Sequence, residues 1–142
     1  MPLLTDDVVQ QLKEEFAKLQ NPVRLAVFSQ MLADPHSEQV KRLVEELAAL
    51  DPKLSAESYN FVTDKEKADA LGIQRIPAIA VLGSDKDYGI RLYGLPSGYE
   101  FGSLIDTILD VSAGASVVSP ETRAALDAIE KNIHIQVFST PT

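Results

Sequence analysis

The sequence contains no cysteine among its 142 residues. The chain therefore supplies no disulfide, no thiolate metal ligand and no nucleophilic thiol. It has only two histidines, His36 and His134, so we expect no histidine-rich metal site and no cofactor. No apolar run approaches the roughly 18 residues of a membrane span, and the acidic residues 1–7 lack the basic region of a secretory signal. These absences favour a cytoplasmic protein.

The charge balance is strongly acidic, with a formal net charge of −8. Nucleic acids and anionic membranes would repel such a chain, so we expect neither as a partner. Hydrophobic residues make up 45% of the chain and charged residues 24%, which is ordinary for a globular protein. The length allows one hydrophobic core and a fragment of a second.

Hydrophobic spacing and breaker residues predict an alternating α/β order over residues 1–111. Thr5 is the expected N-cap of the first helix, and Asn21-Pro22 ends it. The two leading strands, each followed by a helix, favour parallel pairing, and the last two favour an antiparallel hairpin. We therefore predict a mixed four-stranded sheet with helices on both faces. The expected strands are 23–29, 54–62, 78–82 and 88–93, and the later helices are 35–50, 65–71 and 99–111.

A small-residue linker, 112–118, separates this domain from a C-terminal piece, 119–142. Ser119-Pro120 predicts a helix start, and 133–139 (IHIQVFS) is strand-like. Shifted by 110 positions, it lies over 23–29 (VRLAVFS), which indicates an internal repeat whose second copy stops after one helix and one strand. A lone strand leaves backbone groups unpaired. It would pack back on the first domain or pair with a second chain, and we favour a homodimer through this helix and strand.

The candidate site is the corner Asp34-Pro35-His36-Ser37, where the first strand leads into a helix. Two cysteines spaced C-x-x-C at such a position would indicate a dithiol oxidoreductase. Here Asp34 and Ser37 occupy the outer positions, and a carboxylate and a hydroxyl cannot exchange disulfides. The structural interpretation is a helix start, with Asp34 as N-cap and Pro35 as the first helical residue.

The functional interpretation of the same corner is that His36 or Ser37 binds or activates a ligand. A Ser-His-Asp triad is not supported, because residues this close in sequence point in different directions from a helix start. We therefore assign no catalytic residue.

Three stretches carry a resemblance to a known family: Val27-Phe28-Ser29, the pre-proline segment 72–77, and Gly-x-Pro-x-Gly-Tyr-Glu-Phe at 94–101. With helix 103–111, they resemble the N-terminal thioredoxin-fold unit of glutaredoxin-like protein disulfide oxidoreductases. The chain is also similar to the N-terminal domain of the flavoprotein that reduces alkyl hydroperoxide reductase. The match covers nearly the whole chain and implies a thioredoxin-like fold whose C-x-x-C has been lost.

The resemblance also implies a role for Ile76-Pro77. Pro77 corresponds to the cis-proline that faces the dithiol and, with Ile76, offers backbone groups to a substrate, although pattern alone favours a trans bond. In the family, a Thr-Pro-Thr-like segment of the second unit runs into Cys-Pro-x-Cys. This sequence ends at Thr140-Pro141-Thr142. We therefore expect an N-terminal piece of a longer protein, with the active dithiol beyond Thr142.

The expected function is that of a redox-inactive scaffold or docking unit for an active thioredoxin-fold unit or another protein thiol partner. One alternative is a non-redox module that holds extended peptides across Pro77 and residues 34–37. A second alternative is a glutathione-binding enzyme that uses the Ser37 hydroxyl. It is disfavoured because that family adds an all-helical domain and a Glu/Gln-Ser pair after the hairpin, and neither is present here.

Overall fold

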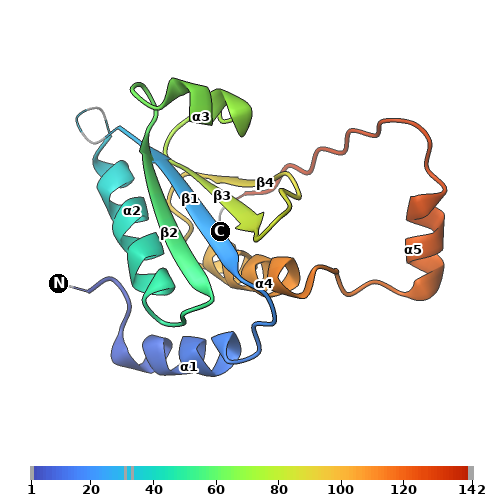
Figure 1. The fold of residues 1–142 in the computed structure, drawn as a ribbon, viewed down its shortest axis with the longest axis horizontal. Coiled ribbons are helices and arrows are strands. Elements are labelled where there is room, and N and C mark those ends of the chain that lie inside the picture. The colour runs from blue at the N-terminus through green and yellow to red at the C-terminus, as the bar shows by residue number, and fades with distance from the viewer. Residues whose placement is uncertain (1, 31, 33, 141–142) are drawn as a thin grey trace.

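The computed structural model describes residues 2–30, 32 and 34–140 (Figure 1). The last two residues of the predicted Thr-Pro-Thr segment, Pro141 and Thr142, lie outside the described residues. Helices and strands alternate as expected over the first 113 residues. The elements are α1 (Asp6–Phe16), β1 (Val23–Ser29), α2 (Pro35–Ala48), β2 (Leu54–Asn60), α3 (Lys65–Ala70), β3 (Ala78–Gly83), β4 (Ile90–Tyr93), α4 (Tyr99–Ala113) and α5 (Pro120–Asp127).

The four strands form one mixed sheet in the order β2-β1-β3-β4. Strands β1 and β2 are parallel, whereas β3 is antiparallel to both β1 and β4. This arrangement confirms the predicted parallel pair, the hairpin and the thioredoxin-like α/β fold. Strands β2 and β4 are shorter than predicted. Strand β2 ends at Asn60 because the Asn60 side chain accepts hydrogen bonds from the backbone N–H groups of Val62 and Thr63, which turns the chain.

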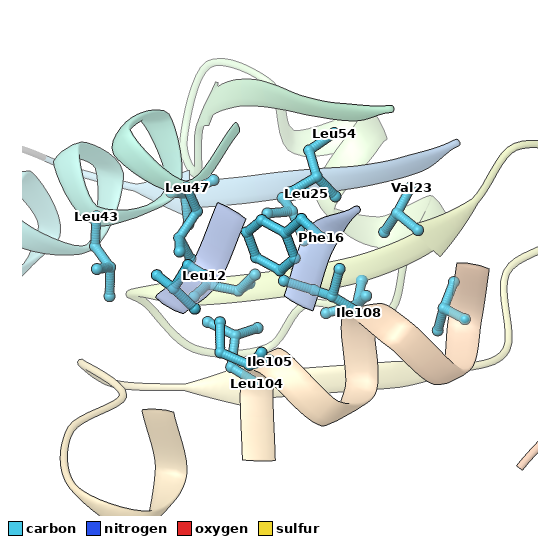
Figure 2. Packing of buried hydrophobic residues seen from close by; sticks show 14 of the residues in the cluster. Leu12, Phe16, Val23, Leu25, Leu43, Leu47, Leu54, Leu104, Ile105 and Ile108 are labelled. Atoms are coloured by element: carbon cyan, nitrogen blue, oxygen red, sulfur yellow. The ribbon is translucent and has the colours of Figure 1, made fainter. Parts of the chain in front are cut away.

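Two hydrophobic clusters lie on opposite faces of the sheet. The larger cluster joins β1 to α1, α2 and α4, and Figure 2 shows Phe16, Leu25 and Ile108 gathered within it. The smaller cluster lies between the other face and the region of α3, and it contains Phe28 and Ala68. Because successive strand residues point to opposite faces, β1 supplies side chains to both clusters. The prediction of helices on both faces is confirmed.

Helix α4 is two residues longer than predicted and includes Ser112, which the sequence had placed in the linker. The Ser112 hydroxyl accepts hydrogen bonds from the N–H groups of Gln20 (2.9 Å) and Asn21 (3.0 Å) and donates one to the Asn21 carbonyl (2.7 Å). The Ser112 side chain is buried, and Gly114 ends the helix with a left-handed φ of 72°. Ser112 therefore connects the end of α4 to the loop before β1.

The C-terminal arm, defined here as residues 115–140, contains one helix and no strand. Helix α5 forms as predicted, and Ser119 caps it by accepting a hydrogen bond from the Thr122 N–H (3.1 Å). The predicted strand at 133–139 is not formed, so this expectation was wrong for the single chain. A strand needs a neighbour to pair its backbone groups, and the arm runs outside the sheet with every described residue exposed (Figure 1). In the part of the chain that the structure describes, no helix has the length and apolar character to cross a membrane.

The Ser112 contacts generate the first prediction. Ser112→Ala removes the buried hydroxyl and leaves three backbone groups of Gln20 and Asn21, in the α1–β1 loop, without this partner. We expect a loss of about 1–3 kcal/mol in the free energy of unfolding, measured by urea denaturation. Ser103→Ala, on the exposed side of the same helix, is the matched control and should change stability by less than about 0.5 kcal/mol. Equal effects of the two changes would contradict the assigned role of Ser112.

Candidate functional site

The corner between β1 and α2 is built as a helix start. Asp34 has extended backbone geometry, and its Oδ1 accepts a hydrogen bond from the His36 N–H (3.0 Å). Its carbonyl accepts from the Ser37 N–H (3.1 Å), and Pro35 takes the first helical position. The predicted N-cap is therefore formed. A carboxylate here also faces the positive end of the helix dipole.

Ser37, the last residue of the corner, lies in the first turn of α2 and is fully buried. Its Oγ lies 3.5 Å from Asp34 Oδ2 and accepts a long hydrogen bond from the Gln30 N–H (3.4 Å). The hydrogen bond between Asp34 and His36 uses the His36 backbone N–H and not its imidazole. The carboxylate therefore does not orient a base, as a catalytic triad requires. Because the Ser37 side chain is buried, glutathione in solvent cannot reach its hydroxyl. This counts against the glutathione-binding enzyme.

The second predicted feature, Ile76-Pro77, lies at the same end of the sheet. The peptide bond between them is cis. Phe28 near the end of β1 pairs with Ala78, so the antiparallel register places Pro77 beside Ser29, the residue that leads into the corner. The Gly94 N–H donates to the Pro77 carbonyl (2.9 Å) and brings the β4–α4 loop to the same place. Three loops therefore converge at this end: the β1–α2 corner, the cis-proline loop and the β4–α4 loop.

Sequence reasoning missed two residues near the cis-proline, Arg75 and Tyr93. The Arg75 guanidinium lies 5.0 Å from the centre of the Tyr93 ring, a cation–π arrangement. Arg75 is otherwise exposed, so it brings a positive charge to the loop before Pro77. Because 18 positions separate the two residues and only the β3–β4 pairing brings them together, no local pattern could have shown the contact.

Strand β4 is connected to α3 by an arginine. Arg91 forms a two-pronged ion pair with Asp87 (2.9 and 2.5 Å), and its Nε donates to the Leu71 carbonyl (2.9 Å). Hydrogen bonding from Arg91 holds the pKa of Asp87 below its ordinary value. This cluster is structural, because it holds the hairpin against the end of α3.

An aromatic pair lies where β1 and β2 end. The rings of Phe28 and Tyr59 stack with centres 5.1 Å apart, and the Tyr59 hydroxyl donates to Glu57 (2.9 Å). Burial, followed by the hydrogen bond to Glu57, raises the pKa of Tyr59, which keeps the hydroxyl protonated. Glu57 in turn pairs with Arg24 (3.1 Å). No three of the described His, Asp and Glu residues come together as a metal site.

The mixed sheet, the helix beginning at its corner and the cis-proline loop beside it define a thioredoxin-like fold. Asp34 and Ser37 stand at the two outer corner positions, and the chain has no cysteine, so this is a thioredoxin-like domain without the redox dithiol.

Comparisons with known proteins agree with this class, although no family model matches the chain. The chain is similar to the crystal structure of the NTD_N/C domain of the alkylhydroperoxide reductase AhpF from Enterococcus faecalis, with a TM-score of 0.80, 28% identity and 90% of this chain covered. It is also similar to a protein disulfide oxidoreductase from Aeropyrum pernix, with a TM-score of 0.77, 25% identity and 87% of this chain covered. Among curated proteins, it is 28% identical over 143 residues to the AhpF component of alkyl hydroperoxide reductase of Staphylococcus aureus (strain NCTC 8325).

The matched relatives are longer than this chain. The match takes in 99% of this chain but only 25% of the Staphylococcus aureus AhpF protein. It takes in 62% of the Enterococcus chain and 54% of the Aeropyrum chain. The finding is therefore a thioredoxin-like domain related to the N-terminal region of AhpF.

The capping contact yields the second prediction. Asp34→Ala removes the acceptor for the His36 N–H, and we expect it to cost about 1 kcal/mol of folding stability, measured by urea denaturation. Asp34→Asn keeps an oxygen acceptor and should stay within a few tenths of a kcal/mol of the unmodified protein. If the Asn variant lost as much as the Ala variant, the negative charge of Asp34 would matter more than its hydrogen bond.

Proposed function

We propose that this chain is a redox-inactive thioredoxin-fold unit that docks an active thioredoxin-fold unit, or another protein thiol partner, within a disulfide-transfer system of the alkyl hydroperoxide reductase type. One observation carries the proposal. The corner that would hold a dithiol is intact as a fold but holds Asp34 and Ser37, in a chain without cysteine.

The chemistry supports the inactive half of the proposal. Disulfide exchange proceeds by attack of a thiolate on a disulfide sulfur. Neither a carboxylate nor a buried hydroxyl can form the mixed disulfide that this step requires. Any electrons that reach a substrate must therefore pass through a dithiol on the partner, and this domain contributes only binding.

Exposed side chains on the converging loops support the docking half. Leu32, in the loop before α2, is fully exposed, and Tyr99, at the start of α4, is 92% exposed. His36, in the β1–α2 corner, and Arg75, in the loop before Pro77, are also exposed. Exposed aliphatic, aromatic and arginine side chains are the residues that protein interfaces favour. We call these four residues the loop surface and propose it as the docking site.

The inactive half is tested by an insulin-reduction assay with dithiothreitol as electron donor. We expect the unmodified chain to show no turnover above a control without protein. The double substitution Asp34→Cys and Ser37→Cys restores C-x-x-C at a helix start, where thiol pKa values are lowered, and should introduce measurable turnover. Turnover by the unmodified chain would refute the proposal. An inactive double variant that is correctly folded would show that the corner no longer has dithiol geometry.

The docking half is tested by nuclear magnetic resonance titration of the chain with a reduced dithiol thioredoxin. We expect amide signals at His36 and Ile76 to shift, and we expect Leu32→Ser or Tyr99→Ala to weaken binding about tenfold. The control Val117→Ser alters an equally exposed apolar side chain on the C-terminal arm and should leave the affinity unchanged. Shifts confined to other surfaces would contradict the loop surface.

A second candidate function is supported by the exposed Arg75 at the loop that carries Ile76 and Pro77. An extended peptide could lie across this loop and the Asp34–Ser37 corner without any redox step. A parallel titration with an unfolded, reduced protein separates the two functions. Shifts at Ile76 with the unfolded protein and none with folded thioredoxin would favour the peptide-binding module.

A further inference from the structure

Arg75, in the loop before Pro77, is an exposed arginine without a counter-charge. Its guanidinium lies 5.0 Å from the centre of the Tyr93 ring. A cation–π contact supplies no oxygen acceptor, so it leaves the five N–H donors of a guanidinium available. Among the residues that the structure describes, no carboxylate pairs with Arg75, not even Glu100, which lines a small hollow together with Tyr93.

Arg91, two residues before Tyr93 on β4, shows the contrast with a fully partnered arginine. Asp87 accepts two hydrogen bonds from its guanidinium, and the Leu71 carbonyl accepts one from its Nε. The Arg91 side chain is only 13% exposed. Arg91 therefore stabilises the fold, whereas the charge of Arg75 is available to a second molecule.

The hairpin fixes the place of Arg75. Tyr93 ends β4 and pairs with Ala78. The next residue, Gly94, donates its N–H to the Pro77 carbonyl (2.9 Å). The ring is thus held against the cis-proline loop, and its contact with Arg75 keeps the guanidinium at the end of the sheet where the three loops converge. A side chain that is held before binding loses less freedom when a partner orders it.

We propose that Arg75 selects the docking partner by forming a two-pronged ion pair with an aspartate or glutamate carboxylate on the surface of the active thioredoxin-fold unit. This inference rests on the proposed docking function and adds the chemistry that the partner has to present. In this scheme Leu32 and Tyr99 supply apolar contact, and Arg75 decides which surface of the partner fits against them.

Charge complementarity favours a carboxylate as the group opposite Arg75. The chain has 21 acidic and 13 basic residues, yet none of the four residues of the loop surface is acidic. A partner carboxylate meets a cation at Arg75, whereas an excess of negative charge would repel it over most of the chain. The planar guanidinium also matches a carboxylate with two parallel hydrogen bonds, as Arg91 and Asp87 do within this chain.

The test is the affinity of reduced dithiol thioredoxin for variants at position 75, measured by nuclear magnetic resonance titration. Arg75→Gln removes the charge and should weaken binding about tenfold, because the partner carboxylate loses its counter-charge. Arg75→Glu places like charges together and should weaken binding about a hundredfold. The difference between the unmodified chain and Arg75→Gln should shrink as the salt concentration is raised, because salt screens the ion pair.

Lys67 provides the matched control. It is also exposed, and its Nζ lies 5.5 Å from the centre of the Tyr59 ring. Tyr59 is on β2 and Tyr93 on β4, the two outer strands of the sheet, so three strand spacings of about 4.8 Å separate the two contacts. Lys67→Gln and Lys67→Glu make the same changes of charge away from the loop surface and should change the affinity less than about twofold. Far-ultraviolet circular dichroism verifies that all four variants are folded.

The outcomes separate this inference from the docking function. If thioredoxin shifts the His36 and Ile76 signals but binds every variant equally well, docking stands and the role of Arg75 is refuted. Equal losses at positions 67 and 75 would also refute it, because only the net charge of the chain would then matter. A loss with Arg75→Gln that does not depend on salt would place an uncharged acceptor opposite Arg75. No binding to the unmodified chain would overturn the docking function and this inference together.

Discussion

Strand β1 is paired along both edges and buried on both faces, and the position of the candidate site follows from it. Its alternate side chains enter the two cores, and a fully buried leucine or phenylalanine such as Leu25 or Phe28 contributes about 1.5–3 kcal/mol. The corner follows β1 after a short connection, and the register with β3 sets the cis-proline loop beside the end of β1. A change that displaced β1 would therefore move the corner and the cis-proline loop together.

The corner shows that the strand-to-helix turn of a thioredoxin-like fold can form without a dithiol. A helix start needs an acceptor for its first free N–H groups. Asp34 supplies one, and its charge suits the end of the helix. Ser37 is small enough for a fully buried position, and Gln30 and Asp34 lie next to its hydroxyl. Both residues are therefore explained by the stability of α2. The docking proposal therefore relies on the exposed residues around the corner and not on Asp34 or Ser37.

The sequence predicted what local chemistry determines and missed what depends on distant partners. Helix caps such as Asp34 and Ser119 and the order of helices and strands along the chain follow from spacing and residue type. The predicted stop of the first helix at Asn21-Pro22 was wrong, because α1 ends at Phe16. Ser112 was placed in a linker because small residues surround it, and only the folded α1–β1 loop shows why it is helical and buried. The contact between Arg75 and Tyr93 exists only because β3 pairs with β4.

The clearest comparison is between two nearly matching segments of the same chain. Residues 23–29 and 133–139 share an apolar pattern and the ending Val-Phe-Ser, yet the first is the central strand and the second is exposed and unpaired. Both have the intrinsic preference for a strand, but a strand exists only where neighbours accept its backbone groups and cover its apolar face. Strand β1 has β2 and β3 beside it and helices over it, whereas the arm has none of these. The apolar pattern of the arm therefore has no partner among the residues that the structure describes, and the same pattern alone does not make a strand.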